Sequence, residues 1–154
     1  MSVYVLALLI GVVAGLRAMT APAAVSWAAH LGWLPLQDTP LAFLGFTATP
    51  YIFTVLAIVE LITDQLPKTP SRTVPMQFGA RLVLGGLSGA AIGAAHGALL
   101  GGLIAGVVGA VIGTLGGAKV RGALARTFGR DLPAALIEDA VAIIGAALIV
   151  MALR

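Results

Sequence analysis

The feature that most constrains this chain is an uncharged run of 37 residues from Leu82 to Ala118. As a single helix the run would extend about 55 Å, against a bilayer hydrocarbon core of about 30 Å. One membrane span is too short to hold it, whereas two spans joined by a tight turn fit it. His96 and Gly97 supply the natural position for that turn.

Composition extends the same conclusion to the whole chain. Of its 154 residues, 60% are hydrophobic and 10% are charged, whereas a soluble domain carries about 25% charged residues. So few charges cannot cover a soluble surface, and the lipid bilayer is the expected surrounding medium. The net charge of +3 does not predict nucleic-acid binding, because the bases are few and segregated along the chain. The chain has no cysteine, which excludes disulfides and thiolate metal sites.

The predicted fold is an all-α integral membrane bundle of about five transmembrane helices in one domain, with four and six spans left open. The expected spans are residues 3–33 (broken near Pro22), 50–66, 76–95, 98–118 and 132–153. The first is expected to be tilted, overhanging or broken, because 31 helical residues would extend about 46 Å. No basic residue precedes it, so we expect a retained membrane segment and not a cleaved signal peptide.

The distribution of bases between the loops predicts the orientation. Residues 34–49 and the turn at His96 contain no Lys or Arg, whereas the other two connectors carry Lys68, Arg72, Lys119, Arg121, Arg126 and Arg130. Because cytoplasmic loops are enriched in these residues, we expect the N-terminus inside and the C-terminus outside. One alternative fits the same rule: residues 3–33 form a re-entrant hairpin with both ends outside.

Glycines recur at every fourth position in two stretches, namely Gly85, Gly89, Gly93, Gly97 and Gly101, and then Gly109, Gly113 and Gly117. This spacing puts them on one helix face, so that neighbouring backbones can approach closely. The pattern predicts glycine-zipper packing, within a protomer or between the protomers of a homo-oligomer. The alternative is that this face lines a narrow pore.

Ionisable residues inside the predicted spans are the candidate binding or pathway residues, because charges at such depth are costly. They are Arg17, Glu60, Asp64, Arg81, Glu138 and Asp139. All but Arg17 lie about 7–10 Å from the predicted cytoplasmic boundary, on three separate segments. At this depth several carboxylates face a single arginine, Arg81, so we expect a surplus of carboxylates. Glu60 and Arg81 are the first expected pair. Two interpretations remain open: static pairing with snorkelling to water, or a route for a solute or ion.

Arg17 stands apart from that group. In a helix that enters from the cytoplasm at Val3 it would lie about 21 Å deep, beyond the membrane midplane. Thr20 and Pro22 follow it, and a helix can unwind there, as the broken helices of transporter binding sites do. The alternative is an interhelical ion pair with a partner such as Glu138.

No catalytic motif is recognisable in the chain. It has no nucleophile elbow, phosphate loop or zinc-protease pattern, and two isolated histidines, His30 and His96, do not make a metal site. We therefore expect no enzyme activity, no cofactor and no metal.

Several short motifs resemble those of a bacterial family of small membrane proteins that carries only a domain-of-unknown-function label. They are Gly15-Leu16-Arg17-Ala18-Met19-Thr20, Glu60-Leu61-Ile62-Thr63-Asp64-Gln65-Leu66-Pro67, Arg72-Thr73-Val74-Pro75, Gly79-Ala80-Arg81 and Glu138-Asp139-Ala140. The resemblance covers nearly the whole chain. It implies a bacterial inner-membrane setting and no particular activity.

Together these patterns predict a small transporter or channel for a cation or proton, acting as an oligomer. The alternative is a non-catalytic assembly or scaffold protein whose intramembrane charges are structural ion pairs. A membrane enzyme acting on lipid, with carboxylates as acid and base, is the third hypothesis. An ion or a small solute is the expected ligand.

Overall fold

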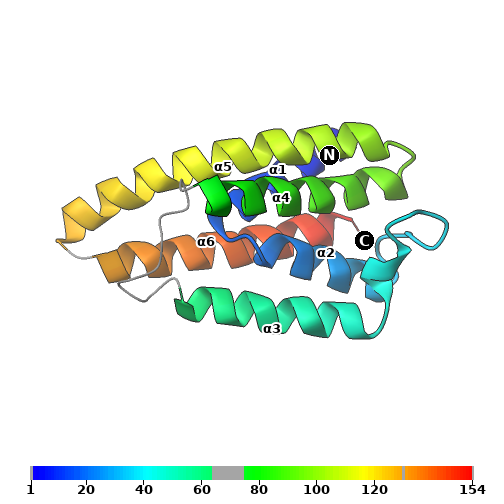
Figure 1. The fold of residues 1–154 in the computed structure, drawn as a ribbon, viewed down its shortest axis with the longest axis horizontal. Coiled ribbons are helices and arrows are strands. Elements are labelled where there is room, and N and C mark those ends of the chain that lie inside the picture. The colour runs from blue at the N-terminus through cyan, green and yellow to red at the C-terminus, as the bar shows by residue number, and fades with distance from the viewer. Residues whose placement is uncertain (1, 64–74, 130, 154) are drawn as a thin grey trace.

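The computed structural model describes residues 2–63, 75–129 and 131–153, and the secondary structure in that part of the chain is entirely helical (Figure 1). The elements are α1 (Val3–Leu16), α2 (Thr20–His30), the 3-10 helix η1 (Ala42–Gly45), α3 (Ala48–Thr63), α4 (Pro75–Ala95), α5 (Leu99–Phe128) and α6 (Asp131–Ala152). The helices run roughly side by side along the long axis of the molecule. The predicted all-α fold class is confirmed.

Three helices in the described part are long and apolar enough to cross a membrane, over Gln77–Ala95, Leu99–Phe128 and Pro133–Ala152. α1 and α3 are apolar but shorter, so the count of five spans is not confirmed. Large apolar side chains face outward, among them Ile62, Leu100 and Leu148, each at least 60% exposed. Such a surface needs apolar surroundings, which a bilayer supplies.

Residues 3–33 form two helices because the chain reverses over Arg17, Ala18 and Met19. Arg17 ends α1 in an extended conformation (φ −142°, ψ 110°). Pro22 accounts for the break, since in a continuous helix its ring would clash with the Ala18 carbonyl and it has no N–H to donate. In the structure Pro22 lies in the first turn of α2, where an N–H needs no partner within the helix.

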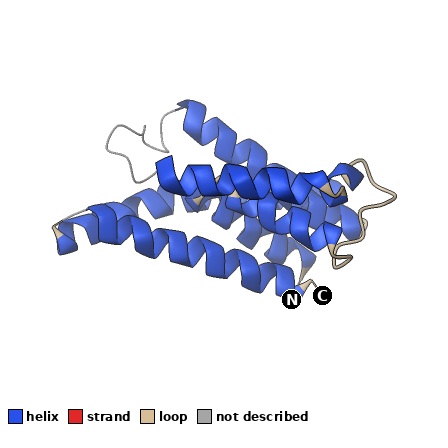
Figure 2. Ribbon diagram, turned by 90° about the horizontal axis from the view of Figure 1, so that it is seen from below, coloured by secondary structure: helices blue, strands red, loops and turns tan. Residues whose placement is uncertain are grey.

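The reversal makes α1 and α2 a helical hairpin with both of its ends at one end of the bundle. α1 runs parallel to α5, because Gly11 lies against Gly106 and Gly15 lies further along α5, against Thr114. α2 runs back, so that its last residue, His30, lies beside Gly45. The N- and C-termini consequently lie at the same end (Figures 1 and 2). The break near Pro22 is one of the forms expected for residues 3–33, and the two helices on either side of it form a hairpin.

Glycines on α5 bring its backbone close to α4 on one side and to α1 on the other. A Cβ atom built on Gly89 of α4 would lie 2.8 Å from Cα of Gly106, and one on Gly15 of α1 would lie 2.5 Å from the Thr114 nitrogen. These glycine positions therefore have no room for a side chain. The predicted glycine stretch from Gly85 to Gly101 does not lie on one helix, however. Gly97 is in the α4–α5 turn with φ +74°, and Gly101 is on α5, against the ring of Tyr4.

α5 is longer than predicted and includes most of the region that we expected to be a basic connector. Its 30 residues extend about 45 Å, so its last turns pass well beyond a 30 Å hydrocarbon core. No proline interrupts residues 119–128, and the helix ends only where Gly129 adopts φ +72°. The prediction of a connector over residues 119–128 is therefore wrong, since these residues are helical. Lys119, Arg121 and Arg126 therefore project from a helix and not from a loop.

Two glycines of α4 give a matched test of this packing. Gly89→Ala should lower stability by about 1–3 kcal/mol, the usual cost of overpacking, because the added methyl group meets backbone atoms. Gly79→Ala should instead raise stability by about 0.5–1 kcal/mol, because a Cβ there meets nothing within 4 Å and alanine favours the helix. The measurement is the midpoint of thermal unfolding in one detergent. Equal midpoints for the two variants would contradict the packing described here.

Candidate functional site

The tip of the α1–α2 hairpin meets charged side chains from four other helices, α3, α4, α5 and α6. Arg17 lies at the tip itself and is fully buried. Its guanidinium meets two adjacent carboxylates of α6: Nη1 donates to Glu138 at 2.5 Å, and Nε donates to Asp139 at 2.5 Å. Nη2 forms a further ion pair with Asp139. Of the two interpretations of Arg17, the structure shows the interhelical ion pair. Arg17 itself lies at the break between α1 and α2.

Glu60 of α3 caps the beginning of α2. Its two carboxylate oxygens accept the backbone N–H groups of Ala18 at 2.8 Å and of Met19 at 2.9 Å. These groups precede the first turn of α2, where N–H groups have no partner within the helix and the helix dipole favours a negative charge. Glu60 therefore stabilises the turn that lets the chain reverse.

Arg81 of α4 holds the other side of the break. Its Nε donates to the Gly15 carbonyl oxygen at 3.2 Å, close to the end of α1, where carbonyl groups lose their helical partners. Its Nη2 lies 3.9 Å from Glu60 Oε2, so the pair expected first from the sequence is present but is looser than that of Arg17 with Glu138.

This geometry changes what replacing the Glu60–Arg81 pair would do. Exchanging both side chains for apolar ones would leave the N–H groups of Ala18 and Met19 buried without the acceptor that they have now. Leaving a buried donor unsatisfied costs about 1–3 kcal/mol. The double replacement is therefore not neutral, unlike that of an isolated buried ion pair.

Arg121 of α5 is a member of the cluster that the sequence interpretation missed. Its Nη1 lies 3.6 Å from Glu138 Oε1, and its side chain is 19% exposed. We assigned it to a connector, although the absence of proline between Ala118 and Gly129 could have indicated that α5 continues.

The described residues of the cluster balance in charge. Three arginines (Arg17, Arg81 and Arg121) face three carboxylates (Glu60, Glu138 and Asp139). The expectation that a single arginine faces the carboxylates is therefore wrong. The prediction excluded Arg17 because α1 was expected to run in the opposite direction, and it excluded Arg121 because that residue was assigned to a connector. Asp64 lies outside the described residues.

Buried hydroxyl groups accompany the cluster along α2. Thr20 is 8% exposed and Ser26 is fully buried, and within the described structure neither side-chain oxygen has a hydrogen-bond partner. Buried polar groups nearly always have a partner, and an orphan calls for a water or an ion as its explanation. Thr114 on α5 is also fully buried, and within the described structure its side-chain oxygen has no hydrogen-bond partner either.

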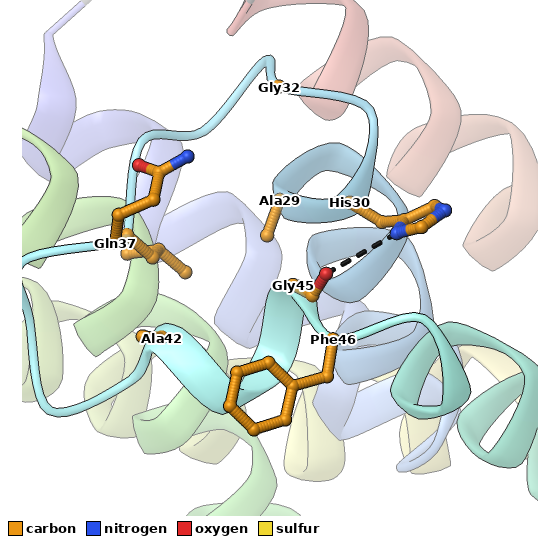
Figure 3. Close-up of a pocket in the computed structure, with 8 residues that line it drawn as sticks. Ala29, His30, Gly32, Gln37, Ala42, Gly45 and Phe46 are labelled. Atoms are coloured by element: carbon orange, nitrogen blue, oxygen red, sulfur yellow. Dashed lines mark hydrogen bonds between the residues drawn. The ribbon is translucent and has the colours of Figure 1, made fainter.

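A hollow of about 320 Å³ lies at the opposite end of α2, between the end of that helix and η1 (Figure 3). His30 and Gln37 line it, and His30 Nδ1 lies 3.3 Å from the Gly45 carbonyl oxygen. Across the described residues, no group of three or more His, Cys, Asp or Glu side chains could hold a metal ion.

Comparisons with family models, with curated proteins and with solved structures found no match to this chain. The function must therefore be argued from the geometry of the cluster.

Removing Arg17 tests whether the cluster holds the fold together. Arg17→Met should lower stability by about 3–5 kcal/mol, because it leaves Glu138 and Asp139 buried without their main partner. Arg17→Met combined with Glu138→Gln and Asp139→Asn should recover much of that loss, since the triple variant strands no carboxylate, and Arg121, which loses Glu138, is 19% exposed and can reach water. Thermal unfolding in detergent measures both. A triple variant no more stable than Arg17→Met would argue against pairing as the cause.

Proposed function

We propose that the protein is a small membrane transporter that moves a proton or cation past the hairpin tip. The observation that carries the proposal is the meeting of three carboxylates at the break between α1 and α2, where Glu60 accepts backbone N–H groups and Glu138 and Asp139 pair with Arg17. Broken helices with freed backbone groups at depth form the binding sites of many transporters. Ionisable groups within spans are expensive, and their usual use is a proton relay or an ion pathway.

Buried hydroxyl groups on α2 fit a transport route. Thr20 and Ser26 are both buried, and their oxygens can bind water or a cation. A hydrated or ion-binding route along α2 would satisfy them. Such a route would lead from Glu60 towards the hollow lined by His30.

In this proposal α3, α4, α5 and α6 span the bacterial inner membrane, and the α1–α2 hairpin dips into it from one side. α1 extends about 21 Å, so its tip would stop about 9 Å short of the far boundary of a 30 Å core. The cluster end also carries Lys119 and Arg126, which favours the cytoplasmic side for that end. Both termini would then be outside.

The proposal also includes an oligomer with glycine-zipper packing of α1, α4 and α5. α3 packs mainly on α2 and η1 and exposes Tyr51, Val55 and Val59. A second copy against this face would complete the enclosure of the cluster.

A scaffold is the second candidate, and the ion pairs themselves favour it. Each described charge of the cluster has an opposite charge or a backbone group as partner, as expected of a static network that only joins helices. The two candidates differ in what Glu60 does, because a scaffold needs its hydrogen bonds and a transporter needs its charge.

Single cysteines test the proposed topology, and the chain offers a clean background because it has none of its own. In intact cells, Ser2→Cys and Asp38→Cys should react with an impermeant thiol reagent added outside, whereas Thr127→Cys should react only after permeabilisation. All three positions are exposed in the structure. Protection of Ser2→Cys together with labelling of Asp38→Cys would mean that residues 3–33 cross the membrane once, contrary to the hairpin.

Flux in liposomes tests the proposed transport. Liposomes with the reconstituted protein should acidify faster than empty ones under an imposed potential, or should take up Na⁺ or K⁺ faster. Glu60→Gln should lose most of that flux but stay folded at a cost of about 1–3 kcal/mol, because its one amide oxygen can still accept one of the two N–H groups at the start of α2 while its charge is gone.

Asp38→Asn is the matched control, since it removes an exposed carboxylate from the loop before η1, outside the cluster. It should leave flux unchanged. Wild-type liposomes no more permeable than empty ones to H⁺, Na⁺ and K⁺ would refute transport of these ions. If the wild type shows no flux and the Glu60→Gln protein does not fold, the scaffold is favoured.

A further inference from the structure

A groove of about 320 Å³ runs between α5 and α6 and reaches α1. It is lined by apolar side chains and small residues, among them Leu16, Ile112, Gly116, Val120, Ile137 and Val141. Its α5 side runs from Ile112 to Leu124, which corresponds to about 18 Å of helix. The volume is at the lower limit of typical ligand sites, which measure about 300–1,000 Å³.

The groove opens sideways, towards the surroundings of the bundle. Ile112, Val120 and Val141 line it and are each more than half exposed. Glycines create the space, because a Cβ built on Gly116 would meet nothing within 4 Å. A long apolar groove with this opening suits a hydrocarbon chain that enters from the bilayer.

One end of the groove is charged. Arg121 and Glu138 are its only charged lining residues in the described part of the chain. Arg121 belongs to the end of α5 that also carries Lys119 and Arg126, and no acidic residue occurs between Leu99 and Phe128. Arg121 is the basic residue that lines the groove, and with Lys119 and Arg126 it gives this end of α5 more positive charge than Glu138 offsets. This end of the groove therefore complements an anion.

We propose that this groove binds an anionic phospholipid, with an acyl chain along α5 and the phosphate at Arg121. Basic pockets between helices on the cytoplasmic side of a membrane bind lipid headgroups of this kind. The lining residues include no serine, threonine, cysteine or histidine, so the groove suits lipid binding and not lipid chemistry. The lipid site shares Arg121 and Glu138 with the cluster, but it does not rest on the transport proposal, since it needs neither Glu60 nor any flux.

The experiment is a competition between two lipids with identical acyl chains. The purified full-length protein in mild detergent receives equal amounts of phosphatidylglycerol and phosphatidylcholine, and native mass spectrometry counts the lipids that stay bound. The wild type should retain phosphatidylglycerol in preference. Arg121→Gln should reduce this preference about fivefold, the effect of one basic group at an anionic surface, and Arg121→Lys should keep it.

Variants that fill the groove test the acyl chain. Gly116→Leu should reduce retention of both lipids, since its side chain would occupy the groove without meeting backbone. Val141→Phe, from an exposed position on α6, should do the same and gives a second route if the first variant does not fold. Gly79→Leu and Arg126→Gln are the matched controls, because neither residue lines the groove.

Four results would overturn the proposal. They are equal retention of the two lipids by the wild type, unchanged retention in folded groove-filling variants, and an effect of Arg126→Gln as large as that of Arg121→Gln. The fourth is a change in the number of protomers on Gly116→Leu with lipid retention unaltered, which would assign the groove to a second copy of the chain.

Discussion

The burial of Arg17 is the constraint on which the arrangement of the other helices depends. A guanidinium without contact to water must be paired, and each missing partner would cost several kcal/mol. Glu138 and Asp139 meet this need from one turn of α6, which fixes the depth and rotation of that helix against the hairpin. Glu60 and Arg81 then hold the two broken backbone ends, which fixes α3 and α4 at the same level. One reversal of the chain thus determines where four other helices place their charges.

Much of this cluster could be predicted from the sequence, because depth along a helix follows from residue number alone. Glu60, Arg81 and Glu138 come from three segments, and counting from the segment ends put them at one level. The direction in which a helix runs through the bundle, by contrast, cannot be derived from residue numbers. α1 has the same 14 residues whichever way it runs, so counting from Val3 gives the same distance to Arg17 in both directions. The prediction measured that distance from the wrong end of the bundle. The contacts of Gly11 and Gly15 with α5 decide the direction, and they exist only in three dimensions.

Loop boundaries were harder to predict than charges. Basic residues mark the end of a hydrocarbon span, but they do not end a helix, and α5 continues through Lys119 and Arg126 to Gly129. Arg121 was missed for that reason. The capping role of Glu60 was also beyond prediction, because it depends on a backbone break whose N–H groups point at a side chain 41 and 42 residues away.

The balance of charge in the cluster has an electrical consequence. A membrane potential acts on a charge with about 2.3 kcal/mol per 100 mV when the charge crosses the whole membrane. The three arginines and three carboxylates of the described cluster sum to zero, so a rigid shift of the group along the membrane normal would do almost no work against the potential. Only a movement that separates Arg17 from Glu138 and Asp139 would transfer charge across the field. In the proposed membrane arrangement, voltage would therefore act on a movement of the hairpin that opens these ion pairs, and not on a movement that carries Glu138 and Asp139 along with Arg17.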